Sequence, residues 1–192
     1  MNALTVNGKQ LTLDGVEIIG YGVPAPVLEE VTIGTQTWKT KNLAIDDGQG
    51  GIYTQTVNYG QGDVVEYYYT WNAAVRVAAS ISGWHLPTTT EFDTLATAVG
   101  GSDVAGTKLK STTGWISGKG TNDFGFSVFP AGYWYSGEAS FIYLGYYSIL
   151  WTANEHSSDY AYRIRFNSSE SMTSTNGRMT DACSVRLVKD AT

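Results

Sequence analysis

Several kinds of residue are scarce in this chain, and each scarcity excludes a class of protein. Cys183 is the single cysteine among 192 residues, so neither an internal disulfide framework nor a zinc cluster of thiolates can form. Lysine and arginine number 12 against 18 acidic residues, which argues against a nucleic-acid-binding surface. No apolar run is long enough to span a membrane. The start of the chain lacks the basic region and apolar run of a signal peptide, so none is expected.

Histidine is also scarce, which limits hydrolytic chemistry, because a nucleophile needs a neighbouring base. His85 stands just before a predicted helix and is expected to be a structural polar anchor, whereas His156 lies in a polar loop as a surface contact. No glycine-rich phosphate loop leads from a strand into a helix. We therefore expect no enzyme, no cofactor and no metal site. A glycan-active enzyme with two carboxylates remains a third possibility.

Glycine and tyrosine are abundant instead, at 22 and 13 residues. Hydrophobic residues make up 42% of the chain and charged residues only 16%. This hydrophobic content is enough for a packed core, and the content of charged residues is below the quarter that is typical of globular proteins. This composition favours a loop-rich, mostly β protein with an adhesive surface.

Residues 1–30 are predicted to be an arm separate from a main domain at 31–192. Val6–Lys9 has the pattern of a hairpin turn, and the apolar residues between Leu11 and Ile19 favour one or two short strands. Two prolines within 23–26 indicate an extended linker. The arm is either a frayed end or the segment through which the chain attaches or forms homo-oligomers.

The first half of the main domain carries the clearest local signals. Residues 31–38 are typical of a hairpin with a glycine turn, and 46–63 are expected to be loop. A buried helix is predicted at 69–79 from the spacing of its alanines. A second helix is predicted from Thr88 to Val99, because Thr88 and Glu91 have the spacing of a capping box. Its apolar stripe consists of Phe92, Leu95, Ala96 and Val99.

The second half is unusually aromatic, with seven tyrosines and two tryptophans between residues 133 and 162. Alternation along a strand divides inward from outward side chains. It predicts that the inward residues are Ile142, Leu144, Tyr162, Ile164, Phe166, Val185 and Leu187. It predicts that the outward residues are Phe141, Tyr143, Arg163, Arg165 and Arg186.

An ordered series of short motifs resembles the major paralogous domain described in Fibrobacter and common in Bacteroidetes, over about residues 31–190. The series is Trp38, Lys41–Leu43, Tyr69–Ala74, Gly83–Thr88, Gly106–Lys110, Asn122–Ser127, Pro130–Tyr133 and Ser184–Val188. The resemblance implies an α+β, C-type-lectin-like fold with two helices and short mixed or antiparallel strands. That fold is related to formylglycine-generating enzymes, whose cysteine chemistry is not carried over to a chain with Cys183 alone.

The last third of the chain resembles the variable region of proteins that are diversified by retroelements, in which error-prone reverse transcription changes template adenines. The matching segments are Trp151–Asn154, Ala161–Ser168 and Ser184–Arg186. The resemblance implies a fixed scaffold with exchangeable surface side chains, and tyrosine and arginine are efficient binding residues. The side chains expected to bind ligand are Trp134, Tyr135, Phe141, Tyr143, Tyr147, Ile149, Glu155, His156, Asp159, Tyr160, Arg163, Arg165, Thr173, Ser174, Met179 and Asp181.

The leading hypothesis is a receptor-recognition protein with a hypervariable surface, on a phage tail or a cell surface. Its expected partner is a protein or glycan on a bacterial cell, with no nucleic-acid partner and no membrane insertion. The rival hypothesis is an undiversified surface module for adhesion or glycan binding.

Overall fold

The computed structural model describes residues 11–13, 16–18 and 30–189. Strands β1 (Leu11–Leu13) and β2 (Val16–Ile18) pair antiparallel, as the apolar residues there predict. The turn expected at Val6–Lys9 and the linker expected at 23–26 lie outside the described residues.

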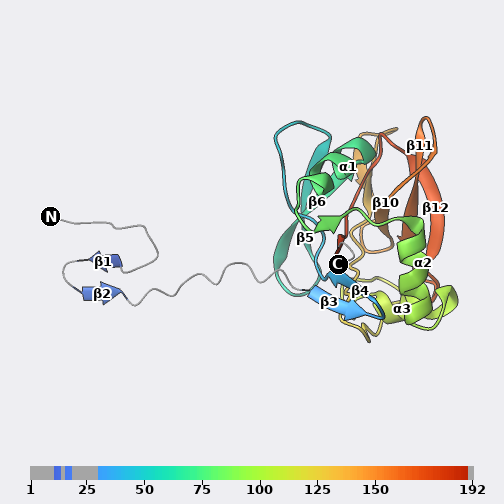
Figure 1. Ribbon diagram of the computed structural model, residues 1–192, viewed down its shortest axis with the longest axis horizontal. Coiled ribbons are helices and arrows are strands. Elements are labelled where there is room, and N and C mark those ends of the chain that lie inside the picture. The colour runs from blue at the N-terminus through green and yellow to red at the C-terminus, as the bar shows by residue number, and fades with distance from the viewer. Residues whose placement is uncertain (1–10, 14–15, 19–29, 190–192) are drawn as a thin grey trace.

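Three antiparallel sheets build the part of the structure between Glu30 and Lys189 (Figure 1). The first sheet has the order β3 (Glu30–Ile33), β4 (Gln36–Lys39), β14 (Val188–Lys189) and β7 (Trp84–His85). The second has the order β5 (Ile52–Asn58), β6 (Asp63–Thr70), β13 (Ala182–Cys183), β8 (Tyr133–Tyr135) and β9 (Ser140–Ile142). The third has the order β10 (Ser148–Ser157), β11 (Tyr160–Phe166) and β12 (Thr173–Arg178).

The number of helices and strands differs from the expected fold class. In the described residues there are three helices, α1 (Trp71–Ala79), α2 (Thr89–Ala98) and α3 (Ser102–Leu109), against twelve strands from β3 to β14. The fold is therefore mostly β, as the composition favours, and the two-helix α+β, C-type-lectin-like expectation is wrong. Helix α3 was not predicted from the sequence, because it contains Gly106, and glycine disfavours a helix. A Cβ on Gly106 would lie 2.4 Å from the carbonyl oxygen of Ser171, so this glycine permits a close approach of two segments.

The hairpin predicted at 31–38 is confirmed as β3 and β4, and Gly34 at their turn has a φ of 60°. The loop predicted at 46–63 is wrong in its second half. There β5 pairs with β6 from Ile52 opposite Tyr69 to Asn58 opposite Asp63. Glycines on both sides of this segment obscure the two-residue alternation that a strand requires.

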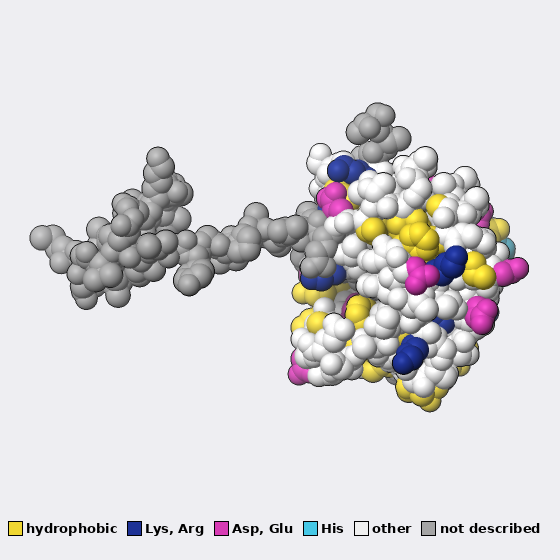
Figure 2. Space-filling view, turned by 90° about the horizontal axis from the view of Figure 1, so that it is seen from below, with side chains coloured by type: hydrophobic (Ala, Val, Ile, Leu, Met, Phe, Trp, Pro, Cys, Tyr) yellow, Lys and Arg dark blue, Asp and Glu magenta, His cyan; other side chains and the backbone are white. Residues whose placement is uncertain are grey.

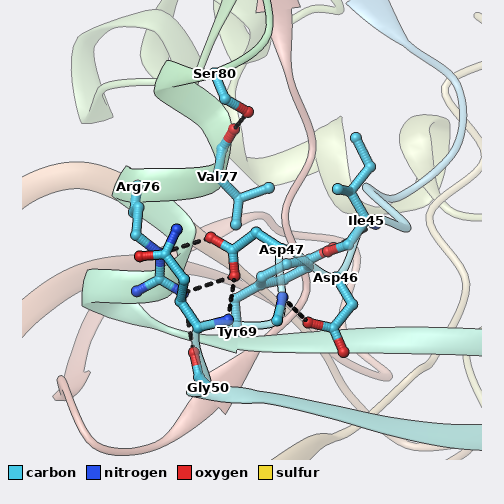
Figure 3. Close-up of polar contacts among 10 residues, drawn as sticks. Ile45, Asp46, Asp47, Gly50, Tyr69, Arg76, Val77 and Ser80 are labelled. Atoms are coloured by element: carbon cyan, nitrogen blue, oxygen red, sulfur yellow. Dashed lines mark hydrogen bonds and ion pairs between the residues drawn. The ribbon is translucent and has the colours of Figure 1, made fainter.

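The segment between β4 and β5 is fixed to α1 by charged and polar contacts (Figure 3). Arg76 of α1 holds the carboxylate of Asp47 with Nε at 2.6 Å and Nη2 at 3.0 Å, and Nη2 also donates to the carbonyl of Gly50 at 2.9 Å. Tyr69 at the end of β6 donates its hydroxyl to the carbonyl of Ile45. This acidic stretch is therefore an anchored loop whose Asp47 carboxylate is held by Arg76.

Helix α2 begins as predicted. The Thr88 hydroxyl accepts the amide of Glu91, and the Glu91 carboxylate accepts the amide of Thr88 at 2.7 Å, which is a complete capping box. His85 contacts the same carboxylate with Nε2 at 2.7 Å from Oε1, the structural role expected for it. Phe92 and Leu95 are fully buried, so the predicted apolar stripe is confirmed.

The core divides into two main clusters, one on each face of the β10–β11–β12 sheet. Leu150, Ile164 and Phe166 join a cluster that includes residues of α2 and α3. Ile149 and Trp151 join a second cluster with residues of α1, β7 and β13. Among the described residues, no helix is both long and apolar enough to cross a membrane.

Candidate ligand-binding site

Arg163 in the middle strand of the three-stranded sheet is the centre of the candidate site. Its guanidinium lies over the ring of Tyr133 at 5.0 Å and over that of Trp151 at 6.0 Å, within the range of a cation–π interaction. The opposite strand offers Gly177, where a Cβ would lie 2.4 Å from Cζ of Arg163. Only 15% of the Arg163 side chain is exposed. Arg163, which was predicted to point outward, is therefore largely covered, because its side chain packs against Tyr133 of the neighbouring sheet.

A buried carboxylate balances the charge of Arg163. Oδ2 of Asp181 lies 3.6 Å from Nη1 of Arg163. Oδ1 of Asp181 accepts hydrogen bonds from the hydroxyl of Ser136 at 2.9 Å and from its amide at 3.2 Å. Because both partners are held by further contacts, Arg163 has a fixed position beneath the surface.

Four tyrosines form a continuous ring cluster beside the arginines. Tyr143 stacks on Tyr147 with ring centres 4.6 Å apart and on Tyr133 at 6.2 Å. Tyr135 meets Tyr133 edge to face at 6.4 Å. Arg165 lies over the ring of Tyr147 at 5.9 Å. We call the surface formed by Tyr133, Tyr135, Tyr143, Tyr147, Arg163 and Arg165 the tyrosine–arginine face.

The backbone places Tyr143 at the most exposed point of this face. Its φ is +60°, a left-handed conformation that few non-glycine residues adopt, and its exposed fraction is 49%. The turn also ends the alternation of β9, so Leu144, predicted inward, is exposed, and Phe141, predicted outward, is half-buried. Tyr143 itself is exposed, as predicted.

Burial sets the chemistry that this face can perform. It raises the pKa of the Cys183 thiol to about 12, so the thiol beneath Arg163 stays protonated and is a poor nucleophile at neutral pH. Burial also raises the pKa of Tyr133, against the opposing effect of the Arg163 charge. The face therefore offers aromatic rings, hydroxyl groups and guanidinium donors, which are groups suited to recognition.

The structure brings together six of the residues expected to bind ligand. They are Tyr135, Tyr143, Tyr147, Arg163, Arg165 and the supporting Asp181. Sequence reasoning missed Tyr133, although it lies two residues before Tyr135 on β8 and so shares its side of the strand. It also missed Arg178, whose pKa is raised first by a hydrogen bond to Tyr160 and then by the charges of Tyr160, Tyr135 and Asp181.

Other expected residues lie elsewhere. Ile149 is buried, so its predicted outward position is wrong. It lies two residues before Trp151 on β10, and alternation places both on the core side. Trp134 stacks on Tyr53 at 3.9 Å, and Phe141 packs against Tyr68 at 4.9 Å. These two therefore stabilise the five-stranded sheet.

The remaining expected residues lie along the β10–β11 hairpin and β12. Glu155, His156 and Asp159 are exposed at the hairpin end, where His156 meets the ring of Tyr162 edge to face. Tyr160 is half-buried there, and Met179 packs against the second core cluster. On β12, Thr173 pairs with Arg165, and Ser174 is exposed. The hairpin end borders the tyrosine–arginine face through Arg178.

Comparison with known protein families finds a match. The family described as Fibrobacter succinogenes major domain matches residues 31–189. No curated protein and no solved structure matches the chain. The matched residues include every strand from β4 to β14 and all of the tyrosine–arginine face. The chain therefore belongs to the Fibrobacter succinogenes major domain family.

Proposed function

We propose that this protein recognises a ligand without catalysing a reaction, and that the tyrosine–arginine face is the binding surface. The observation that carries the proposal is the stack of Tyr133, Tyr143 and Tyr147 over Arg163 and Arg165, which brings Tyr143 to the surface. Tyrosine and arginine are the residues enriched at the energetic centres of interfaces. Tyr143 is the exposed ring of this cluster, and the half-buried rings behind it hold it in place for contact with a partner.

Preorganisation supports the proposal. The rings contact one another, and the ion pair with Asp181 fixes Arg163. A ligand would then bind without first ordering these side chains, which is the main entropic cost at flexible interfaces. Tyrosine adds a large contact area at a small entropic cost.

The expected ligand is a protein or glycan on a bacterial cell surface. Arg165 can bind a carboxylate with two donors or stack on a ring, and the tyrosine rings suit either partner. Seen from below, the molecule has several separate hydrophobic patches with sparse charges of both signs among them (Figure 2).

Tyr143→Asn tests the binding surface. Asparagine tolerates the left-handed backbone of residue 143, so the free energy of unfolding should change by no more than about 0.5 kcal/mol. Loss of the central ring should weaken binding by about tenfold or more. Binding is measured with labelled protein on glycan arrays and on a panel of bacterial strains, beside thermal unfolding.

Tyr146→Asn is the matched control, because Tyr146 has the same exposed fraction of 49% and lies three residues along the chain. It should leave binding unchanged. If the Tyr143 variant binds every wild-type target with undiminished affinity, the face is not the binding surface.

We further propose that the side chains of this face are diversified by a retroelement and displayed on a phage tail or cell surface. The positions proposed to be exchangeable, such as Tyr135, Tyr143 and Arg165, lie at the edge of a scaffold with a buried core. Sequencing the genomic neighbourhood tests this: a reverse-transcriptase gene and a near-identical template repeat of the 3′ coding region are expected. Their absence would leave an undiversified adhesion module.

A further inference from the structure

A hollow that shares no residue with the tyrosine–arginine face lies between the segment after β4 and the β5–β6 hairpin. Its volume is about 350 Å³, at the lower end of the range for small-molecule pockets. Leu43, Val64, Val65 and Phe129 supply apolar walls. Val64 and Val65 are 44% and 53% exposed, so apolar surface is accessible at the rim.

One wall of this hollow is a chain of hydrogen bonds that starts in the core. Arg186 is 1% exposed, although alternation predicted that it points outward. Its Nη2 and Nε donate to Oδ1 of Asn42 at 3.0 and 3.3 Å. Since Oδ1 of Asn42 accepts from Arg186, its amide nitrogen is directed to Oε2 of Glu66, at 3.1 Å. Tyr59 donates its hydroxyl to the other oxygen of Glu66 at 3.3 Å.

This arrangement fixes a carboxylate in a mostly apolar pocket. Both oxygens of Glu66 are held, and each keeps a further lone pair with which it can accept a hydrogen bond. Burial lowers the pKa of Arg186 to about 10, and the Glu66 charge acts in the opposite direction. Arg186 is therefore still charged at neutral pH, and the polar wall is oriented before any ligand arrives.

The charges around the hollow narrow the class of ligand. The Asn42 side chain links Arg186 to Glu66, because it accepts a hydrogen bond from Arg186 and donates one to Glu66. The positively charged Lys41 lines the same hollow. The positive charges of Arg186 and Lys41 offset part of the negative charge of Glu66, so a cationic ligand gains less from it. An anionic ligand would have to lie against the Glu66 carboxylate, which can only accept hydrogen bonds and so offers the anion no donor. A neutral ligand with several hydroxyl donors and one apolar face fits this hollow best, because its hydroxyl groups can donate to Glu66 while its apolar face packs on the apolar wall.

We propose that this hollow is a saccharide-binding site, in which hydroxyl groups of one sugar ring donate to Glu66 and its C–H face packs on Phe129. Tyr59 stacks on the Phe129 ring with ring centres 4.7 Å apart, which fixes the orientation of that ring. The site is separate from the proposed binding face, so either can exist without the other.

Titration of the full ¹⁵N-labelled chain with glucose, galactose, mannose, xylose and N-acetylglucosamine tests the proposal. At least one sugar should shift the amide signals of Val65, Glu66 and Phe129 saturably at millimolar concentration. Glu66→Gln should weaken that binding by about tenfold, as expected for the loss of a charged acceptor. Tetramethylammonium and acetate, as charged probes, should not shift these signals.

Val65→Lys provides a variant that folds, because the side chain it replaces is exposed. It should abolish sugar binding, because a long side chain at this rim position obstructs the hollow. Val75→Lys is the matched control, since Val75 is an exposed valine on α1 outside the hollow. No response to any of the five sugars, undiminished binding by Val65→Lys, or tighter binding of a charged probe would overturn the proposal. Tyr143→Asn should leave the sugar titration unchanged, so failure at one site is distinguishable from failure at the other.

Discussion

Trp151→Ala should lower the free energy of unfolding by about 3–5 kcal/mol, the usual cost of removing a fully buried tryptophan. Trp151 is fully buried between the three-stranded sheet and the second core cluster. Its indole nitrogen donates to the carbonyl of Tyr69 at 2.7 Å, and truncation leaves that acceptor without its donor. Because a whole domain is stable by only about 5–15 kcal/mol, this loss brings the protein close to unfolding.

Urea denaturation followed by far-ultraviolet circular dichroism measures the effect without relying on tryptophan fluorescence. Tyr162→Ala is the control from the neighbouring strand. Sequence reasoning predicts that both substitutions unfold the domain, but Tyr162 is only half-buried. Its loss should therefore be clearly smaller. Equal unfolding midpoints for Trp151→Ala and the wild type would contradict the burial of Trp151.

Arg186→Met should also destabilise the protein strongly, by about 3–5 kcal/mol, because several buried acceptors lose their donor at once. Arg186 donates to the carbonyl of Lys39 at 3.2 Å, to that of Phe126, and to Asn42. Methionine fills a similar volume but cannot satisfy these oxygens. The same urea denaturation, compared with wild type, gives the change in free energy.

Arg186→Lys separates charge from geometry. Lysine keeps the positive charge but lacks the planar fork that reaches several acceptors, so its stability should lie between those of the methionine variant and the wild type. If the methionine variant is as stable as the wild type, the buried guanidinium makes no net contribution. Desolvation of the charge would then cancel its hydrogen bonds.

A helix or strand could be predicted where the local sequence pattern that marks it also stabilises it. The capping box at Thr88 and Glu91 both marks and stabilises the start of α2. Helix α3 has no side-chain cap at Gly101 and contains Gly106, so no local sequence signal predicts this helix. Its formation depends on packing against the segment around Ser171, which no single stretch of sequence reveals.

The candidate site was predictable to the extent that strand alternation holds. Alternation correctly groups Arg163 with Arg165, and it would have grouped Ile149 with Trp151 in the core. It could not reveal that a second sheet covers the arginine side, or that Asp181 supplies the opposite charge. It failed for Arg186 because residues 184–187 lie between the short strands β13 and β14 and outside both.

The position of β4 between β3 and β14 determines how the described domain transmits mechanical load. Glu30 at the start of β3 forms ion pairs with Lys39 at 2.9 Å and Lys189 at 3.6 Å, and Lys39 lies over the Trp84 ring. When the chain is pulled at residues 30 and 189, the tension is therefore borne by the hydrogen bonds of this sheet, by the two ion pairs and by the contact of Lys39 with Trp84. The three-stranded sheet that carries Arg163 lies outside that path, so its geometry would persist while the chain is pulled.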